Sequence, residues 1–509
     1  MKSNILVPGQ GLSGALRSNT NLPSPPSRQV WGFEWNQNTD TWRHIGLGGQ
    51  TLTLTEADFD AHPLWGNIKR CVLTADGTPT FGSNARGDGL DLTGASGRIM
   101  VRIPKFFVKS VSPSANVYRY WADYLPFTGA VVHPAFYQRG GTLRNQIYVG
   151  AYAADFVYDG DNEAYNAAHE KLHSRTGKQP YTGNADCIWR IPIDDLANEP
   201  AINDVVAGSE GGFYIVDYVK TAGAWGGGGA GDTALLWLRK PGDATCGIVN
   251  LDALTNTTQG GEAVGNVTAN PTGKGVTLGE CRTLGGNIGA GWGVENFWTR
   301  SAWKLLWYIE NATGNSQTAL GLGIVNKAGG TGFAGELNGA HSADTNIGTN
   351  GTGTGTGTNG LTPVVWRGLE NPWGNIWNFI DGYNAVDAEY RIIKRDGTGT
   401  FADTLTAGNY EASIAAPLTN PGGGYVFGYA SNIEYEPLLA LLFIPKEIAG
   451  ASNTYLCDYF YSHQKTQTNI LLAGSHWYDG VLAGVAVLRS KDVASVAART
   501  VGARAECIL

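Results

Sequence analysis

Glycine constrains the fold of this chain more than any other residue does. The chain has 72 glycines among 509 residues, and only 16% of its residues are charged. Glycine costs backbone entropy inside helices and strands but suits tight turns, so this composition favours turns, loops and short strands over long helices. A hydrophobic content of 42% still indicates a folded protein, and the length predicts about three domains at roughly 150 residues each.

The C-terminal segment, residues 472–504, contains a regular frame of small and aromatic residues. The pattern G-x-x-W-x-x-G-x-x-A-G runs from Gly474 to Gly484, and G-A-R follows at 502–504. The residues between the frame positions share no size, charge or polarity. Neither the alternation of a strand nor the apolar stripe of a helix explains this mixture.

This frame resembles the variable region of proteins that diversity-generating retroelements diversify. In that family the region closes a C-type-lectin-like domain and carries a mutable ligand-binding face. Such systems randomise adenines in a template rich in Asn codons, and one first-base change in an Asn codon gives His, Tyr or Asp, the residues found at 476, 478 and 479. A Lys codon cannot arise from an Asn codon in this way if the third base stays a pyrimidine. Lys491 is therefore left out of the variable set.

The resemblance implies a set of exposed ligand-binding side chains and a set of frame residues that hold the backbone. The implied ligand-binding residues are Ser475, His476, Tyr478, Asp479, Val481, Leu482, Val485, Ala486 and Arg489. The implied frame residues are Trp477, Gly480, Gly484, Gly502 and Arg504.

A second motif, G-x-E-N-x-W-G-N-x-W-x-x-x-D-G, spans residues 368–382. It resembles a segment shared by C-type-lectin folds of the formylglycine-generating-enzyme kind and by many phage tail proteins. The resemblance implies that Trp373 and Trp377 anchor the core. It also implies that Asn371 and Asn375 pin loops through bonds from side chain to backbone.

Together the two motifs predict an α+β fold, a C-type-lectin-like domain with loop insertions over residues 127–509. A smaller β-rich domain is expected at 31–126, and a Pro-rich attachment arm at 1–30. Alternating aromatic residues predict a hairpin over 31–45. An apolar stripe at Trp298, Ala302, Leu305, Leu306 and Ile309 predicts a core-facing helix over 295–310.

Charge, hydropathy and cysteine spacing exclude several classes of partner. The net charge is −8, and no run of Lys or Arg is present to follow a phosphate backbone, so nucleic acid is not expected as a partner. No window approaches ~18 consecutive apolar residues, so membrane insertion is not expected either. The six cysteines are widely spaced and predict free thiols, with no metal and no cofactor.

The favoured function is a non-enzymatic receptor-binding protein at a phage or prophage tail tip. Its expected partners are a protein or glycan receptor on a host cell, and tail components that meet the N-terminal arm. A homotrimer made in the bacterial cytoplasm and carried on the virion is expected. A diversified lectin-like binding protein at a cell surface is the alternative location.

Three other functions are weighed against this interpretation. A formylglycine-generating oxidase needs two reactive cysteines close together, but Cys457 and Cys507 stand fifty residues apart in sequence. A calcium-dependent lectin needs a carboxylate-rich loop that residues 370–372 only partly match. The His-Glu-x-x-His pattern at 169–173 fits a zinc protease only if it lies on a helix against a cleft.

Overall fold

The structure is a computed structural model. It describes residues 29–509 apart from 160–166, 183–187, 202–203, 210–212, 227–231, 240–245, 274–275, 328–337, 340–346, 355–358, 387–388, 404–407, 413–417, 419–423, 438 and 464–465. The attachment arm expected at 1–30 therefore lies almost wholly outside the described residues.

The described residues form a β-rich protein, so the predicted α+β class is wrong. Strands make up 36% of these residues and helices 12%. The helices are α1 (Glu56–Ala61), α2 (Leu278–Gly286), α3 (Phe297–Asn311) and α4 (Ser316–Ala319), with 3-10 turns η1 (Trp65–Asn67), η2 (Pro134–Tyr137), η3 (Ala167–His169), η4 (Ala440–Leu442) and η5 (Gly480–Leu482). One strong helical stripe had suggested a helical layer, but the glycine-rich remainder forms short strands and turns.

The N-terminal sheet has five strands in the order β2-β1-β7-β6-β8. Its strands are β1 (Trp31–Asn36), β2 (Thr41–Gly46), β6 (Phe107–Ser114), β7 (Val117–Asp123) and β8 (Val131–Val132). Strands β1 and β2 form the predicted hairpin, with Trp35 opposite Trp42. The rings of these two residues stack at 5.0 Å between centroids.

A six-stranded sheet in the order β19-β33-β9-β5-β3-β4 joins early and late parts of the chain. Its strands are β3 (Lys69–Leu73), β4 (Pro79–Phe81), β5 (Arg98–Pro104), β9 (Gln146–Gly150), β19 (Trp292–Val294) and β33 (Ala505–Cys507). Strand β9 pairs with β5 on one side and with β33 on the other. The sheet therefore continues across the domain boundary expected between residues 126 and 127.

The largest sheet has eight strands and carries the C-terminal segment. Its strands are β23 (Trp377–Val386), β24 (Glu389–Ile393), β25 (Tyr410–Ala412), β26 (Phe427–Tyr429), β29 (Tyr459–Tyr461), β30 (Asn469–Ala473), β31 (Leu488–Asp492) and β32 (Val501–Gly502). They run in the order β25-β24-β23-β30-β31-β29-β26, and β32 pairs with β23. The pairs β29–β31 and β23–β32 are parallel.

Three small sheets complete the main body. They are β10 (Asp155–Tyr158) with β11 (Glu170–His173), β20 (Gly353–Thr354) with β21 (Val364–Trp366) and β22 (Leu369–Glu370), and β27 (Asn432–Ile433) with β28 (Pro445–Glu447).

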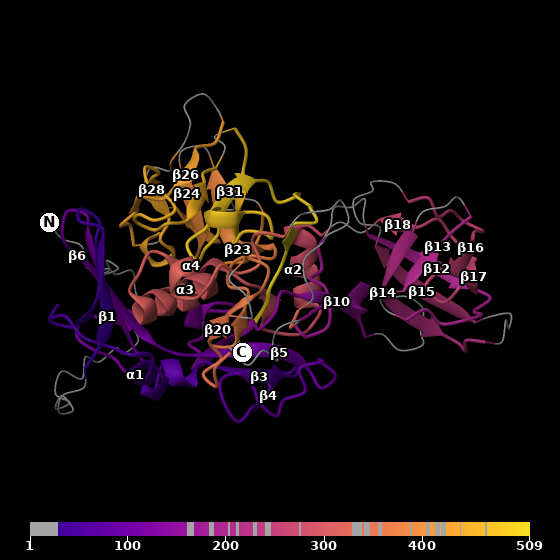
Figure 1. Cartoon of the computed structure of the whole chain (residues 1–509), viewed down its shortest axis with the longest axis horizontal. Helices are drawn as coiled ribbons and strands as arrows, with labels where there is room; N and C mark the ends of the chain where they lie inside the picture. The colour runs from indigo at the N-terminus through magenta and orange to yellow at the C-terminus, as the bar shows by residue number, and fades with distance from the viewer. Residues whose placement is uncertain are drawn as a thin grey trace.

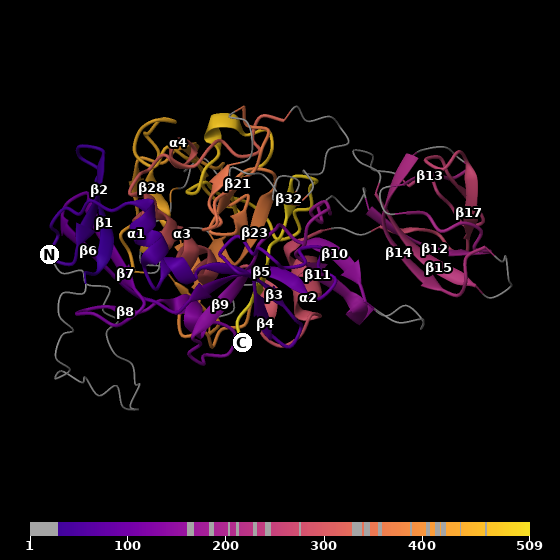
Figure 2. The same cartoon turned by 60° about the horizontal axis from the view of Figure 1, so that its bottom comes forward.

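The described residues between 188 and 273 form a separate β-barrel, which was not predicted from the sequence. Its strands are β12 (Ile188–Asp194), β13 (Val205–Ala207), β14 (Phe213–Ala222), β15 (Thr233–Arg239), β16 (Ala253–Asn256), β17 (Glu262–Val267) and β18 (Thr272–Gly273). The pairings run β12-β15-β14-β13-β16-β17 and return to β12, so six strands close on themselves. The barrel has its own apolar core and projects from one end of the molecule (Figures 1 and 2).

The predicted central helix is confirmed as α3, and it lies deep in the main body (Figure 1). The Asn296 side chain caps its first turn by accepting hydrogen bonds from the backbone of Trp298 and Thr299. Every residue from 297 to 309 is buried, so the helix is covered on all sides and not along one stripe alone. The buried charged residues of the helix have polar partners; for example, Lys304 Nζ donates a hydrogen bond to the Leu442 carbonyl at 2.9 Å.

The second motif lies in the core, as its tryptophans predict. Trp373 is fully buried and Trp377 is 2% exposed. Asn371 and Asn375 have left-handed backbones, with φ of 48° and 66°, a conformation that Asn tolerates better than most residues. Among the described residues the buried Oδ1 of Asn371 has no hydrogen-bond partner, so the loop-pinning role predicted for this side chain is wrong at that atom.

Candidate functional site

The C-terminal segment leaves the eight-stranded sheet and returns to it. Strand β30 ends at Ala473 and β31 begins at Leu488, and these two strands are antiparallel neighbours. Residues 475–482, here called the display loop, connect them at one end of the sheet and end in the turn η5. The loop therefore stands on two paired strands of the largest sheet.

Trp477 fixes the middle of the display loop to the core. Its side chain is 2% exposed and packs with Ala153, Ile324 and Ile376. Its backbone N–H donates to the Asn375 carbonyl at 3.1 Å, and its carbonyl accepts from Lys327 N–H at 2.8 Å. This frame residue thus ties the display loop to the loop of the second motif.

Gly484 is required by a buried carboxylate. A Cβ atom at this position would lie 1.9 Å from Asp458 Oδ1. The same carboxylate accepts a hydrogen bond from Ala486 N–H at 2.6 Å. Asp458 therefore holds the chain as it returns to the sheet, and only glycine leaves room for it.

Arg504 links the end of the C-terminal segment to two other parts of the body. The guanidinium is 1% exposed and donates to the carbonyls of Gly150 and Glu370 at 2.8 and 2.7 Å. At Gly502, a Cβ atom would come within 2.9 Å of Ile376 Cδ1. Both residues are placed to hold the backbone, as the sequence frame implies.

The nine implied ligand-binding residues do not share one degree of exposure. Tyr478 and Val481 are exposed, at 70% and 56%. His476, Asp479, Leu482 and Arg489 are half-buried, and Ser475, Val485 and Ala486 are buried. Six of the nine therefore reach the surface, all within the display loop or on the adjacent strand β31.

The expectation that Ser475, Val485 and Ala486 are exposed is wrong. Ser475 lies two residues after the end of β30 with a left-handed backbone at φ 66°, and its buried hydroxyl has no hydrogen-bond partner among the described residues. Val485 N–H donates to Ser316 Oγ at 3.1 Å, and Val485 and Ala486 both join the main core. The backbone N–H groups of Val485 and Ala486 therefore have buried side-chain partners, which hold these two residues in the interior.

His476 and Asp479 close the turn within the display loop. Asp479 Oδ2 accepts from His476 N–H at 2.7 Å, and it lies 3.3 Å from His476 Nδ1. Burial lowers the pKa of His476 and raises the pKa of Asp479, while the attraction between the two groups opposes both changes. The pair shapes the loop and also leaves part of each side chain at the surface.

Arg489 connects the display loop to the neighbouring strands. Its guanidinium lies 5.6 Å from the centre of the Trp377 ring, and its Nη2 donates to Asp492 Oδ1 at 2.7 Å. Arg489 stands beside Tyr461 in the parallel pair β29–β31. The sequence analysis missed the aromatic residues of β26 and β29, although Tyr425, Phe427 and Tyr429 alternate visibly in the sequence.

The His-Glu-x-x-His pattern does not lie on a helix. His169 ends the short turn η3, and residues 170–173 form strand β11. His173 is buried, whereas His169 is half-buried and lies 3.2 Å from Asp159. The zinc-protease alternative therefore lacks the helical geometry that it requires.

The cysteines that the oxidase alternative needs are shielded from solvent. Cys457 and Cys507 are both buried, and burial raises the pKa of each thiol to about 12. Reactive cysteines have a lowered pKa and an electropositive, partly exposed setting. These two thiols therefore lack the properties on which that chemistry depends.

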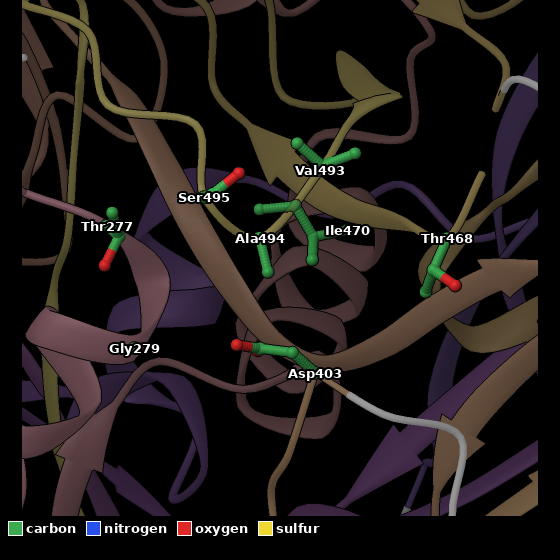
Figure 3. Close-up of a pocket in the computed structure, with 8 residues that line it drawn as sticks. All are labelled: Thr277, Gly279, Asp403, Thr468, Ile470, Val493, Ala494 and Ser495. Atoms are coloured by element: carbon green, nitrogen blue, oxygen red, sulfur yellow. The ribbon is translucent and has the colours of Figure 1, made fainter.

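A pocket of about 430 Å³ lies at the other end of the β30–β31 pair (Figure 3). It is lined by Thr277, Gly279, Asp403, Thr468, Ile470, Val493, Ala494 and Ser495. Asp403 at its edge accepts a hydrogen bond from Arg282 Nη2 at 3.0 Å. None of the nine implied ligand-binding residues lines this pocket, so it is separate from the display loop.

Comparisons with known proteins add no identification. No protein-family model matches the chain, and a search of curated proteins finds no significant match. Within the described part of the chain, no helix has the length and apolar character needed to cross a membrane.

Proposed function

We propose that this chain is a non-enzymatic ligand-binding protein that presents a diversified face, and that it acts as a receptor-binding protein at a phage or prophage tail tip. The supporting observation is the contrast within the display loop. Trp477 is buried and hydrogen-bonded, while its neighbours Tyr478 and Val481 are the most exposed of the implied ligand-binding residues. Such a loop can change its exposed side chains and keep its backbone.

The exposed residue types suit a binding role. Tyr and Arg are enriched among residues that dominate binding energy, and a few such positions can each contribute ~2 kcal/mol or more. Tyr478 and Arg489 are the residues of these types within the implied set. The proposed receptor is a molecule on a host cell surface, and tail components would meet the N-terminal region.

The test uses fluorescently labelled full-length protein and a panel of bacterial strains. In a strain that binds, the double variant Tyr478→Ala/Val481→Ala should bind at least about tenfold more weakly. Its melting temperature should stay within a degree or two, because surface substitutions usually change stability by less than about 0.5 kcal/mol.

The matched control is Val249→Ala/Leu251→Ala, which removes two exposed apolar side chains from the barrel. Unchanged binding by the display-loop variant, or binding to no strain at all, would contradict the proposed function. The diversification itself is tested in the DNA. A neighbouring reverse-transcriptase gene and a near-copy of the codons for residues 472–504 that differs only at adenines would support it.

A further inference from the structure

A row of solvent-accessible aromatic residues lies on strands β26 and β29 and just before β26, in the sheet that carries the display loop; Figure 1 labels β26 near β31. This aromatic strip consists of Tyr425, Phe427, Tyr429, Tyr459 and Tyr461. Strands β26 and β29 are antiparallel, with Phe427 opposite Tyr461 and Tyr429 opposite Tyr459. Alternation therefore places these four rings on one face, while Phe460 between them is buried in the core.

Every residue of the strip is partly accessible to solvent. Phe427 is 57% exposed, and the four tyrosines are half-buried. Neighbouring rings lie 5.0 to 6.4 Å apart and are tilted by 30° to 84° to one another. Clustered exposed aromatic groups of this kind mark interaction surfaces more often than isolated exposed residues do.

The strip is continuous with the display loop. Tyr461 stands beside Arg489, and the Trp377 ring lies 6.4 Å from the ring of Tyr461 and 6.4 Å from that of His476. The charge of Asp479 also raises the pKa of Tyr461, in addition to the larger effect of burial. The two sets of side chains therefore form a single surface.

This surface carries cations although the whole chain has a net charge of −8. Lys491 Nζ lies 4.6 and 5.2 Å from the ring centres of Tyr425 and Tyr461. Among the described residues its ammonium contacts these aromatic groups and no carboxylate. Arg489 and Arg499 add positive charge near His476, against the carboxylates of Asp479 and Asp492.

We propose that the aromatic strip and Lys491 form the constant half of the binding face, and that its partner is a protein surface carrying carboxylates. This inference rests on the proposed function of the display loop. Tyrosine-rich surfaces with scattered cations are typical of protein-recognition sites, in which rigid rings supply contact area at low entropic cost. The strip would contribute binding affinity in every natural variant of the protein, and the side chains of the display loop would determine which partner is bound.

The test compares four variants of the full-length protein on a strain that the wild type binds. They are Phe427→Ala/Tyr459→Ala in the strip, Lys491→Gln, Tyr478→Ala/Val481→Ala in the display loop, and the barrel control Val249→Ala/Leu251→Ala. The strip variant should bind about tenfold more weakly, which corresponds to ~1.4 kcal/mol. Lys491→Gln should weaken binding and make it less sensitive to salt.

The cells themselves identify the class of partner. Treatment with a protease should abolish binding, whereas periodate oxidation of surface sugars should leave it intact. The reverse result would overturn a protein partner in favour of a glycan.

The variants separate failure of this inference from failure of the proposed function. If only the display-loop variant loses binding, the strip is not part of the face, and the proposed function stands. If only the strip variant loses binding while its melting temperature is unchanged, the display loop is not a binding element and the single face is ruled out. Loss of binding by the barrel control would contradict both.

Discussion

At the scale of single residues, steric room decides which positions of the C-terminal segment are free to vary. Gly484 has no such room, because a Cβ atom would lie 1.9 Å from Oδ1 of Asp458, the carboxylate whose Oδ2 accepts a hydrogen bond from Ala486 N–H. Gly484→Ala should therefore cost about 1–3 kcal/mol of unfolding free energy, as overpacked cores do. Denaturant unfolding of the two proteins measures this difference.

The matched control is Gly286→Ala at the end of α2, where a Cβ atom would meet nothing within 4 Å. There the added methyl group restricts the unfolded chain and should leave stability unchanged or raise it by about 0.4–1 kcal/mol. Equal losses at the two glycines would show that Asp458 does not set the requirement at position 484.

Trp373 tests the placement of the second motif. It is fully buried, its Nε1 donates to the Leu322 carbonyl at 3.1 Å, and its ring meets that of Trp307 edge to face at 6.1 Å. Trp373→Ala should cost about 3–5 kcal/mol in denaturant unfolding, as large aromatic truncations in cores do. Tyr478→Ala is the exposed aromatic control, and a melting temperature for Trp373→Ala equal to that of wild type would refute the core role.

His133 should make the fold sensitive to acid. Burial lowers its pKa to about 3, and in the structure its Nδ1 accepts a hydrogen bond from Ala135 N–H. As pH falls below about 6.5 the unfolded chain takes up a proton that the folded protein refuses. The contribution of neutral His133 is therefore complete above pH 6.5 and is lost progressively between pH 6.5 and 3.

The comparison with His133→Gln isolates this effect from other titrating groups. Between pH 6.5 and 4 the wild type should lose about 3 kcal/mol more stability than the variant does, at roughly 1.4 kcal/mol per pH unit. Denaturant unfolding across this pH range measures both curves. Parallel curves would mean that His133 is not held neutral by its burial.

The sequence predicts the frame residues of the site better than it predicts the variable ones. Trp477 and Arg504 can be recognised as frame residues. A large aromatic ring gains stability by burial, and a guanidinium inside the protein needs hydrogen-bond partners that fix its position. Ser475 and Val485 were assigned because they stand between the frame positions, and that spacing contains no information about burial. Their positions depend on backbone bonds to residues far away in sequence, such as that from Val485 N–H to Ser316 Oγ.

At the scale of elements, short-range periodicity predicted a helix and a hairpin correctly, whereas the fold class was predicted wrongly. Helix α3 and the hairpin β1–β2 follow from short-range periodicity, and both were predicted. The β-rich class follows from the glycine content, but one conspicuous helix and a family resemblance favoured α+β. The alternation of Tyr425, Phe427 and Tyr429 is visible in the sequence, but the aromatic strip forms only when β26 pairs with β29, and the alternation within one strand does not specify that pairing.

Strand β15 of the inserted barrel contributes side chains to two hydrophobic cores, and this can be tested by mutation. On β15, Leu236 and Leu238 face the barrel core, while Trp237 between them packs against Phe156 and Tyr158 of β10. Trp237→Ser should therefore loosen the barrel from the body without unfolding it. A larger radius of gyration in X-ray scattering with an unchanged far-UV circular dichroism spectrum is the expected result.

The control for this prediction is Leu236→Ser, which buries a hydroxyl inside the barrel and should unfold the barrel itself. Its circular dichroism spectrum should then lose strand signal. An unchanged radius of gyration for Trp237→Ser would mean that contacts other than this tryptophan hold the barrel in place.

At the scale of the whole molecule, the C-terminal strand secures the display loop to the earliest sheets. Strand β33 pairs with β9 and β19 inside the six-stranded sheet, and Glu506 accepts a hydrogen bond from Asn296 Nδ2 at the start of α3. The segment that carries the loop is thus held at both of its ends. A variable surface on a rigid body can change its partner without changing the assembly that carries it.

The resemblance to phage tail-tip proteins, together with the proposed variable face, is the reason to expect a homotrimer. A face whose residues vary will often bind a new partner weakly, and tethering several copies can raise avidity by ~10²–10⁴ without any new contact. Analytical ultracentrifugation at micromolar concentration should therefore give about three times the chain mass of 54.0 kDa. Gly484→Ala that remains folded should keep this mass, because Asp458 and the display loop act within one chain. A strictly monomeric wild-type protein would contradict the trimer, and avidity would then have to come from the number of copies on the particle.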